Sequence, residues 1–108
     1  MDINIEEKKK YLSTYRLQQA KIGRITEMLT LFPDEETILK KQLLEARQRR
    51  DKIEQEILAL DDEILSELLS QKYMCGRSLS EIAICMNYSK RQIERLHKKA
   101  LTMFICEY

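Results

Sequence analysis

The sequence predicts an all-α protein, with a long, coiled-coil-like antiparallel helical hairpin followed by a C-terminal helix-turn-helix. Its 108 residues include only two glycines and one proline, and valine is absent. No Asn-Gly or Asp-Gly dipeptide marks a β-hairpin, so strand signals are missing. The chain has 34% charged residues and much Leu, Ile, Glu, Lys, Arg and Gln, a composition typical of long helices. The length suits one modest domain, or a small domain with an extended arm.

Two stripes of apolar residues at heptad spacing predict the hairpin, with helices over about 4–32 and 35–60. The first stripe is Tyr11, Tyr15, Ile22, Ile25, Leu29 and Phe32, and the second is Leu39, Leu43, Ala46, Ile53, Ile57 and Leu60. Polar Gln18 and Arg50 each interrupt one stripe. They either fix the register of the helices or extend into solvent, and we favour solvent. Because two helices bury only a thin core, we expect the arm to pack on the C-terminal module or on a second copy, forming a homodimer.

The helix boundaries follow from proline and acidic residues. Pro33 disfavours helical geometry in the preceding residue, so the first helix should end at Phe32, and Asp34 offers an N-cap oxygen to the second. Asp61-Asp62 can cap a third helix, which is either separate or the continuation of the second as one bent rod. Its predicted core-facing residues are Ile64, Leu65, Leu68, Leu69 and Tyr73. The chain thus divides into an arm, residues 1–60, and a helix-turn-helix domain, residues 61–108.

Two capping boxes predict the helix-turn-helix. Gly76 is typical of a helix end, and Ser78 with Glu81 forms a Ser-x-x-Glu box before a short helix over 79–86. Eleven residues later, Ser89 with Gln92 repeats the device as Ser-x-x-Gln. The core of the motif is predicted to contain a small residue at the helix crossing, a residue that tolerates left-handed geometry in the turn, and a branched apolar residue facing back. These are Ala83, Asn87 and Ile93, and the remaining core residues are Leu79, Ile82, Met86, Tyr88 and Leu96.

The exposed side of the second helix is predicted to be basic. At about 100° per residue, Arg91, Arg95 and Lys98 lie opposite Ile93. Residues 71–108 contain 7 Lys and Arg against 3 Asp and Glu, whereas residues 1–70 contain 12 against 15, so an anionic partner is expected at the C-terminal end. Glu94 beside this face repels phosphate, accepts from a cytosine amino group, or pairs with Lys98.

The residue types on this face match contacts to double-stranded DNA. The predicted DNA-binding residues are Arg77, Ser89, Lys90, Arg91, Gln92, Arg95, Lys98 and Lys99. Arg91 and Arg95 suit bidentate contacts to guanine, and Gln92 suits adenine if it turns toward the groove. Arg77 and Lys90 are expected to contact the backbone, because cations outside the groove meet phosphates first. The alternative is a basic helix face that is merely solvated.

Catalysis, metal binding and a membrane location are not expected. The chain has no glycine-rich phosphate loop and too little core for a substrate pocket, so we predict no enzyme and no cofactor. His97 with Cys85 or Cys106 lacks the spacing and number of a zinc site. No apolar run approaches the length of about 18 residues that a transmembrane helix needs. Three cysteines without Cys-x-x-Cys spacing fit free thiols in the cytoplasm.

The run from Leu68 to Leu101 resembles region 4 of sigma-70-type sigma factors. The similar residues are Ser80-Glu81-Ile82-Ala83, Asn87-Tyr88-Ser89 and Ile93-x-x-Leu96-x-x-x-Ala100-Leu101. With the long-helix arm and the total length, the chain also resembles the ArpU/RinA-like late-gene activators of prophages in Gram-positive bacteria. The resemblance implies promoter binding, and contact with RNA polymerase where sigma region 4 docks. The family often has Gly where this chain has Asn87, and nothing here resembles sigma region 2.

These observations predict a sequence-specific, double-stranded DNA-binding transcription regulator of phage or prophage type, which reads the major groove with the helix that starts at Ser89. One alternative is an adaptor that engages RNA polymerase or a sigma factor without binding DNA. Another is a coiled-coil component of phage assembly. The sequence leaves open the DNA target, activation versus repression, and the oligomeric state.

Overall fold

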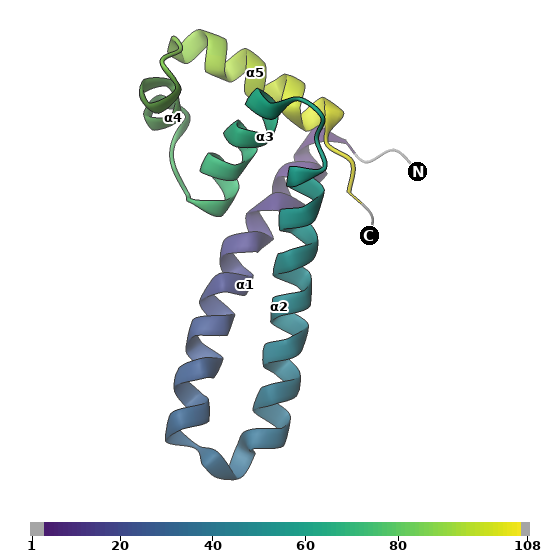
Figure 1. The fold of residues 1–108 in the computed structure, drawn as a ribbon, viewed down its shortest axis with the longest axis vertical. Coiled ribbons are helices and arrows are strands. Elements are labelled where there is room, and N and C mark those ends of the chain that lie inside the picture. The colour runs from purple at the N-terminus through teal and green to yellow at the C-terminus, as the bar shows by residue number, and fades with distance from the viewer. Residues whose placement is uncertain (1–3, 107–108) are drawn as a thin grey trace.

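A computed structural model describes residues 4–106, and this part of the chain is helical with no strand, as predicted. The elements are α1 (Ile5–Leu31), η1 (Pro33–Glu35), α2 (Glu36–Leu58), α3 (Glu63–Leu69), η2 (Ser70–Met74), α4 (Leu79–Met86) and α5 (Lys90–Met103). The molecule is elongated, with extents of 52 × 34 × 21 Å. Helices α1 and α2 run antiparallel along the long axis, and α3 to α5 gather at the end of the hairpin that is opposite its tip (Figure 1). We call α3 to α5 with η2 the module.

The tip of the hairpin differs from the prediction in two details. Pro33 does end α1, which stops at Leu31 with Phe32 as its cap. The N-cap prediction for Asp34 is wrong, because residues 33–35 form a short 3₁₀ turn and α2 begins after Glu35 without a side-chain cap. Phe32 does not belong to the buried stripe either, and it is 50% exposed. It lies beyond Leu39, the last buried residue of α2 toward the tip, so no layer covers it.

The two polar positions of the stripes behave differently from each other. The prediction that Gln18 extends into solvent is wrong: it is only 5% exposed, and its Oε1 is buried without a hydrogen-bond partner. Arg50 keeps partial solvent access, and its guanidinium donates across the hairpin to Gln19 Oε1 at 2.9 Å. Leu12, outside the predicted stripe, is fully buried at the base of the hairpin, where η2 and α5 pack on α1.

Helices α2 and α3 are separate, which settles the alternative that the sequence left open. α2 ends at Leu58, and Asp62 caps α3 by accepting from the backbone N–H groups of Ile64 and Leu65 at 3.0 and 3.1 Å. The predicted core residues Leu65, Leu68, Leu69 and Tyr73 are buried. Ile64 is 42% exposed and does not belong to the core. It lies in the first turn of α3, one residue before Leu65, the first buried residue of that helix.

One continuous core joins the base of the arm to the module. Leu12, Tyr15, Ile53 and Ile57 of the arm share it with the buried residues of α3, η2, α4 and α5. The Lys8 ammonium also donates to the carbonyl of Leu101, at 2.9 Å, near the C-terminal end of α5, where a cation is favourable. The arm therefore packs on the module, as one of the two predicted arrangements requires.

The division of the chain into two parts between residues 60 and 61 remains a prediction. The outer ends of the two parts, residues 1–3 and 107–108, lie outside the described residues.

The outer half of the hairpin has a much smaller core. Its hydrophobic cluster consists of Ile25, Leu39 and Leu43, with Ile22, Met28 and Leu29 packed against them. This part of the arm projects away from the module with nothing on either face (Figure 1). Its stability depends on two helices alone.

Candidate nucleic-acid interface

Helix α4 is short, and its start is fixed by its cap. The Ser78 hydroxyl accepts from the Glu81 N–H at 3.2 Å, and the Glu81 carboxylate accepts from the Ser78 N–H at 3.3 Å. This closed capping box pairs two of the N–H groups that a helix start leaves free. Before it, Gly76 ends the preceding element at φ +73°, a left-handed backbone that favours glycine. Both features agree with the prediction.

The turn between α4 and α5 depends on Asn87. Asn87 has φ 62° and ψ 43°, and it is the one non-glycine residue with positive φ in the described part of the chain. Asparagine tolerates this region better than most residues because its short polar side chain can bond locally. The reversed backbone lets the Tyr88 N–H donate to the Ala83 carbonyl at 2.9 Å, which closes the end of α4. The turn is therefore tight and defined.

Helix α5 starts at a second capping box and crosses α4 through small and branched residues. The Ser89 hydroxyl accepts from the Gln92 N–H at 3.1 Å, and Gln92 Oε1 accepts from the Ser89 N–H at 2.9 Å. Ala83 and Ile93 are 4% and 0% exposed, as expected for the crossing point. Ile82 is fully buried, whereas Leu79, Met86, Tyr88 and Leu96 are partly buried against the same core. α4 and α5 thus form the predicted helix-turn-helix.

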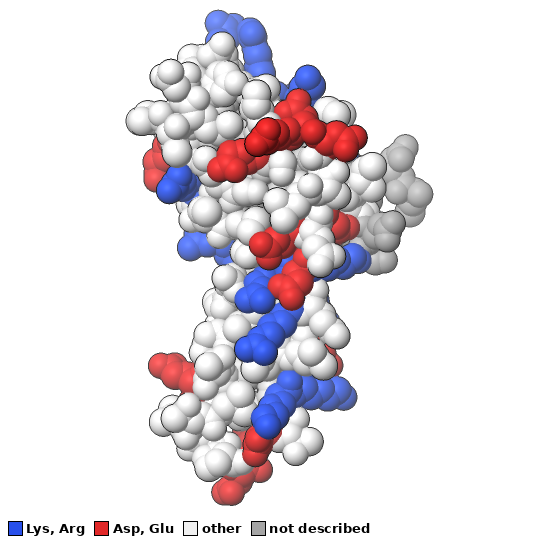
Figure 2. Space-filling model, in the orientation of Figure 1, with Lys and Arg blue, Asp and Glu red and all other residues white. Residues whose placement is uncertain are grey.

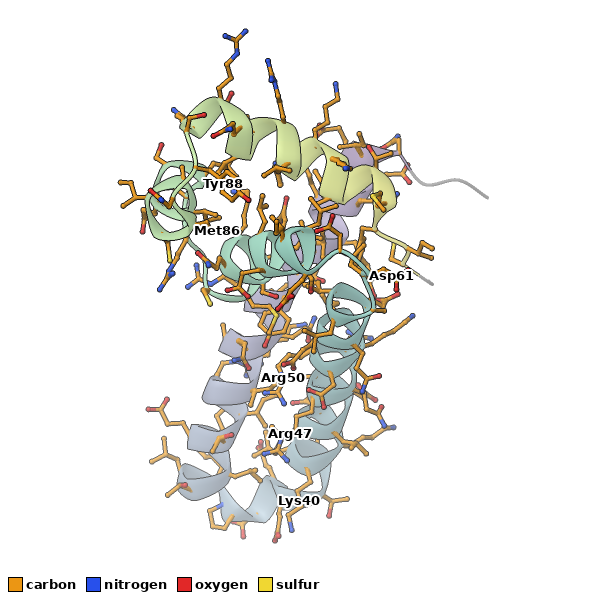
Figure 3. The ribbon with its side chains drawn as sticks, turned by 45° about the horizontal axis from the view of Figure 1, so that its top comes forward. Lys40, Arg47, Arg50, Asp61, Met86 and Tyr88 are labelled. Carbon is orange, nitrogen blue, oxygen red and sulfur yellow. The ribbon has the colours of Figure 1, made fainter. Side chains whose placement is uncertain are left out.

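The predicted contact residues of α5 and its N-cap share one exposed surface. Arg91, Arg95 and Lys98, which we call the basic ridge, are all exposed, whereas Ile93, Ala100 and Phe104 on the other side of α5 are fully buried. In the described part of the chain no carboxylate lies within ion-pair distance of the ridge. Ser89, Lys90, Gln92 and Lys99 are exposed beside it. Basic side chains of α5 project from the end of the molecule away from the hairpin (Figures 2 and 3).

Acidic residues limit where an anion can approach. Figure 2 shows a row of acidic side chains over the side of the module that α3 and α5 form. These helices contain exposed Glu63, Glu67 and Glu94. Glu94 makes no ion pair with Lys98 among the described residues, so its two DNA-directed roles stay open as predictions. A polyanion is therefore favoured at the ridge and disfavoured on the adjoining side.

Two predicted contact residues have structural partners already. The Gln92 amide oxygen belongs to the cap, and a bidentate contact with adenine needs both amide atoms, so that contact requires the cap bond to open. Arg77 is exposed, but its guanidinium donates to Gln71 Oε1 at 3.2 Å and to Cys85 Sγ at 3.3 Å. Arg77 is thus held against η2 and α4. It lies in the segment between these two elements, whereas the ridge is on α5.

A buried polar pair ties α5 to η2, and sequence reasoning missed it. His97 Nε2 and the Tyr73 hydroxyl share a hydrogen bond at 2.8 Å, and both side chains are buried. Burial lowers the pKa of His97 to about 4, with the charges of Lys72 and Lys9 acting in the same direction. Burial also raises the pKa of Tyr73 to about 12. His97 is therefore neutral at pH 7 and holds the side of α5 opposite the ridge. Its i+4 spacing from Ile93, on the packed side of α5, was the available signal.

Outside this interface, the described residues contain free thiols but no metal-binding cluster. They contain no group of three or more His, Cys, Asp or Glu side chains that could bind a metal ion. Cys75 and Cys85 are exposed thiols and Cys106 is a partly buried one. Within residues 4–106, no helix is both long and apolar enough to cross a membrane.

Comparisons with known proteins identify no relative. No family model, no curated protein and no solved structure matches this chain. The interface formed by α4 and α5 is therefore interpreted from its own geometry and charge.

Proposed function

We propose that this protein is a double-stranded DNA-binding transcription regulator that reads the major groove with α5, starting at Ser89. The main supporting observation is that a capped helix-turn-helix presents three cations without ion-pair partners on the side of α5 opposite its buried residues. A major groove about 12 Å wide accepts one α-helix, and cations on such a helix reach base edges and flanking phosphates.

Position along α5 suggests the role of each residue. Arg91 lies in the first turn of α5 and Arg95 one turn later, so both suit guanine in the groove. Lys98 and Lys99 lie further along the helix and suit phosphates. Ser89, Lys90 and Arg77 suit the backbone beside the groove.

The rigid attachment of α5 favours binding. The Lys8 ammonium holds its C-terminal end, His97 and Tyr73 hold its middle, and the Ser89 box holds its start. A helix that is ordered before it meets DNA loses little conformational entropy on binding, which preserves affinity.

The resemblance to sigma region 4 and to prophage activators extends this proposal. It suggests promoters as targets and contact with RNA polymerase. The alternative of an adaptor that does not bind DNA draws support from exposed apolar residues on the arm, among them Leu17, Leu31 and Ile38. Reversing the charges of Arg91 and Arg95 separates the two, because an adaptor that uses the arm keeps its partner and a DNA-binding protein loses its site.

The decisive experiment selects bound fragments from bacterial and prophage DNA and then titrates salt on the recovered site. We expect log K to fall with log salt at a slope of about −0.9 per phosphate contacted. Arg91→Ala and Arg95→Ala should each cost about 1–3 kcal/mol on that site. Arg47→Ala, an exposed arginine of α2, is the matched control and should leave binding unchanged. No recovered site, or binding that salt does not weaken, would refute the proposal.

A further inference from the structure

The outer half of the arm has a groove between α1 and α2 that is lined for a helical partner. The groove has a volume of about 400 Å³. On α2 its lining residues include Ile38, Gln42, Glu45 and Arg49, at steps of four, three and four, which place them along one stripe of the helix. Met28 of α1 lines it as well. This stripe is distinct from the buried one that holds the hairpin together.

On α1, Arg24 and Met28 line the same groove, and they belong to a second heptad stripe. Leu17, Arg24, Met28 and Leu31 follow one another at steps of seven, four and three. Leu17 and Leu31 are 53% and 67% exposed, and Ile38 across the groove is 63% exposed. Heptad apolar residues left in water on a two-helix arm favour closure by further helices into a bundle.

Five charged side chains line the groove (Lys21, Arg24, Glu35, Glu45 and Arg49), and the outermost two, Glu35 and Arg49, have opposite charges. Glu35 lines the groove at the hairpin tip, and Arg49 lines it at the end toward the module. Neither forms an ion pair within the described residues, and both are exposed. A second copy laid antiparallel places Glu35 against the partner's Arg49, twice by symmetry, whereas a parallel copy places like charges together.

We propose that two copies of this chain pair antiparallel through this groove, forming a four-helix bundle between two modules. The two-fold axis of this pair is level with Gln42 of α2. On α2 it sets Ile38, which projects, against the partner's small Ala46, and it brings the two Gln42 amides together.

The pairing has a consequence for the proposed function. Helix α5, which contains the basic ridge, lies at the end of the molecule opposite the hairpin tip (Figure 1). In the antiparallel pair the two ridges therefore face away from each other at opposite ends, so one dimer joins two separate duplexes or two distant sites. This consequence rests on the DNA-binding proposal, whereas the pairing itself does not.

Charge exchange tests the pairing by analytical ultracentrifugation of the full chain. Glu35→Arg and Arg49→Glu should each weaken the dimer by about tenfold or more, because each creates two like-charge contacts. The double variant should restore it, and so should a mixture of the two single variants. Lys41→Glu is the control for Arg49→Glu, because it makes the same change of charge at an exposed position outside the groove. This variant should remain dimeric. Unchanged helical circular dichroism verifies that each variant is folded.

Two outcomes overturn the pairing: a wild-type chain that stays monomeric at its highest soluble concentration, and a dimer that neither single variant weakens. A second assay asks whether an immobilised duplex captures a labelled duplex through the protein. We expect capture by the wild type and its loss in Arg49→Glu, which should still bind a single duplex. If no variant binds any duplex while the ultracentrifuge still shows the expected pattern, only the DNA-binding proposal fails.

Discussion

The buried pair of His97 and Tyr73 makes the stability of the module depend on pH. His97 is the one histidine of the chain. In the folded protein its pKa is lowered to about 4 from 6.5, chiefly by burial. Between these values the unfolded chain binds the proton and the folded chain does not, so the free energy of unfolding falls as pH falls. The contribution is complete above pH 6.5 and is lost progressively down to about pH 4.

The size of the effect follows from the difference between the two pKa values. At about 1.4 kcal/mol per pKa unit, the gap gives a loss of at most about 3 kcal/mol over this interval. That is a large part of the stability expected for a chain of this size, about 5–15 kcal/mol. Because His97 lies on α5, the loss should loosen the recognition helix from η2.

The assay is urea unfolding of the wild type and of His97→Gln at a series of pH values. Carboxylates also titrate near pH 4, so the informative quantity is the difference between the two proteins. Gln can still bond the Tyr73 hydroxyl but binds no proton, so the wild type should lose more stability than the variant as the pH falls. In Tyr73→Phe the extra loss should persist, because burial, the largest cause, remains.

A direct titration of His97 by NMR completes the test, since the one histidine gives an unambiguous signal. A folded-state pKa of His97 near 6.5, or parallel stability curves for wild type and His97→Gln, would refute the reasoning.

Three further predictions concern single positions and are checked by chemical denaturation. Gly76→Ala should destabilise the folded protein by about 1–2 kcal/mol, because the backbone φ there is +73°. Gly23→Ala, in open space within α1, should stabilise the folded protein by about 1 kcal/mol. Equal effects of the two substitutions would contradict this reasoning. Asn87→Ala should destabilise by about 1 kcal/mol and Asn87→Gly should not, since only Gly accepts the left-handed turn more readily. Gln18→Met should stabilise by about 1 kcal/mol by removing a buried oxygen without a partner, and a loss of stability would indicate that an unseen bond exists.

The local features of the helix-turn-helix could be predicted because they depend on neighbours in sequence. A capping box joins residues three apart, so Ser78 with Glu81 and Ser89 with Gln92 are visible in the sequence and present in the structure. The left-handed Asn87 follows from the same short-range logic.

The errors arose where a long-range contact decides burial. Gln18 was expected in solvent, yet the two helices of the hairpin bury it, and Phe32 was expected in the stripe, yet it lies beyond the last packed layer. Leu12 and His97 were missed as core residues because their partners lie on elements far along the chain. Periodicity predicts which face of a helix is apolar, but not how far along the helix a partner extends.

The sequence by itself determined that the chain is all α, where its helices begin at the capped positions, and that α5 has one basic and one apolar side, because these depend on composition, caps and the helical period. Only the tertiary structure decided that the base of the arm shares the core of the module while its outer half does not, because that depends on which surfaces meet in space. It also decided which apolar stripes and charges remain without a partner, which is the observation from which the antiparallel pairing follows.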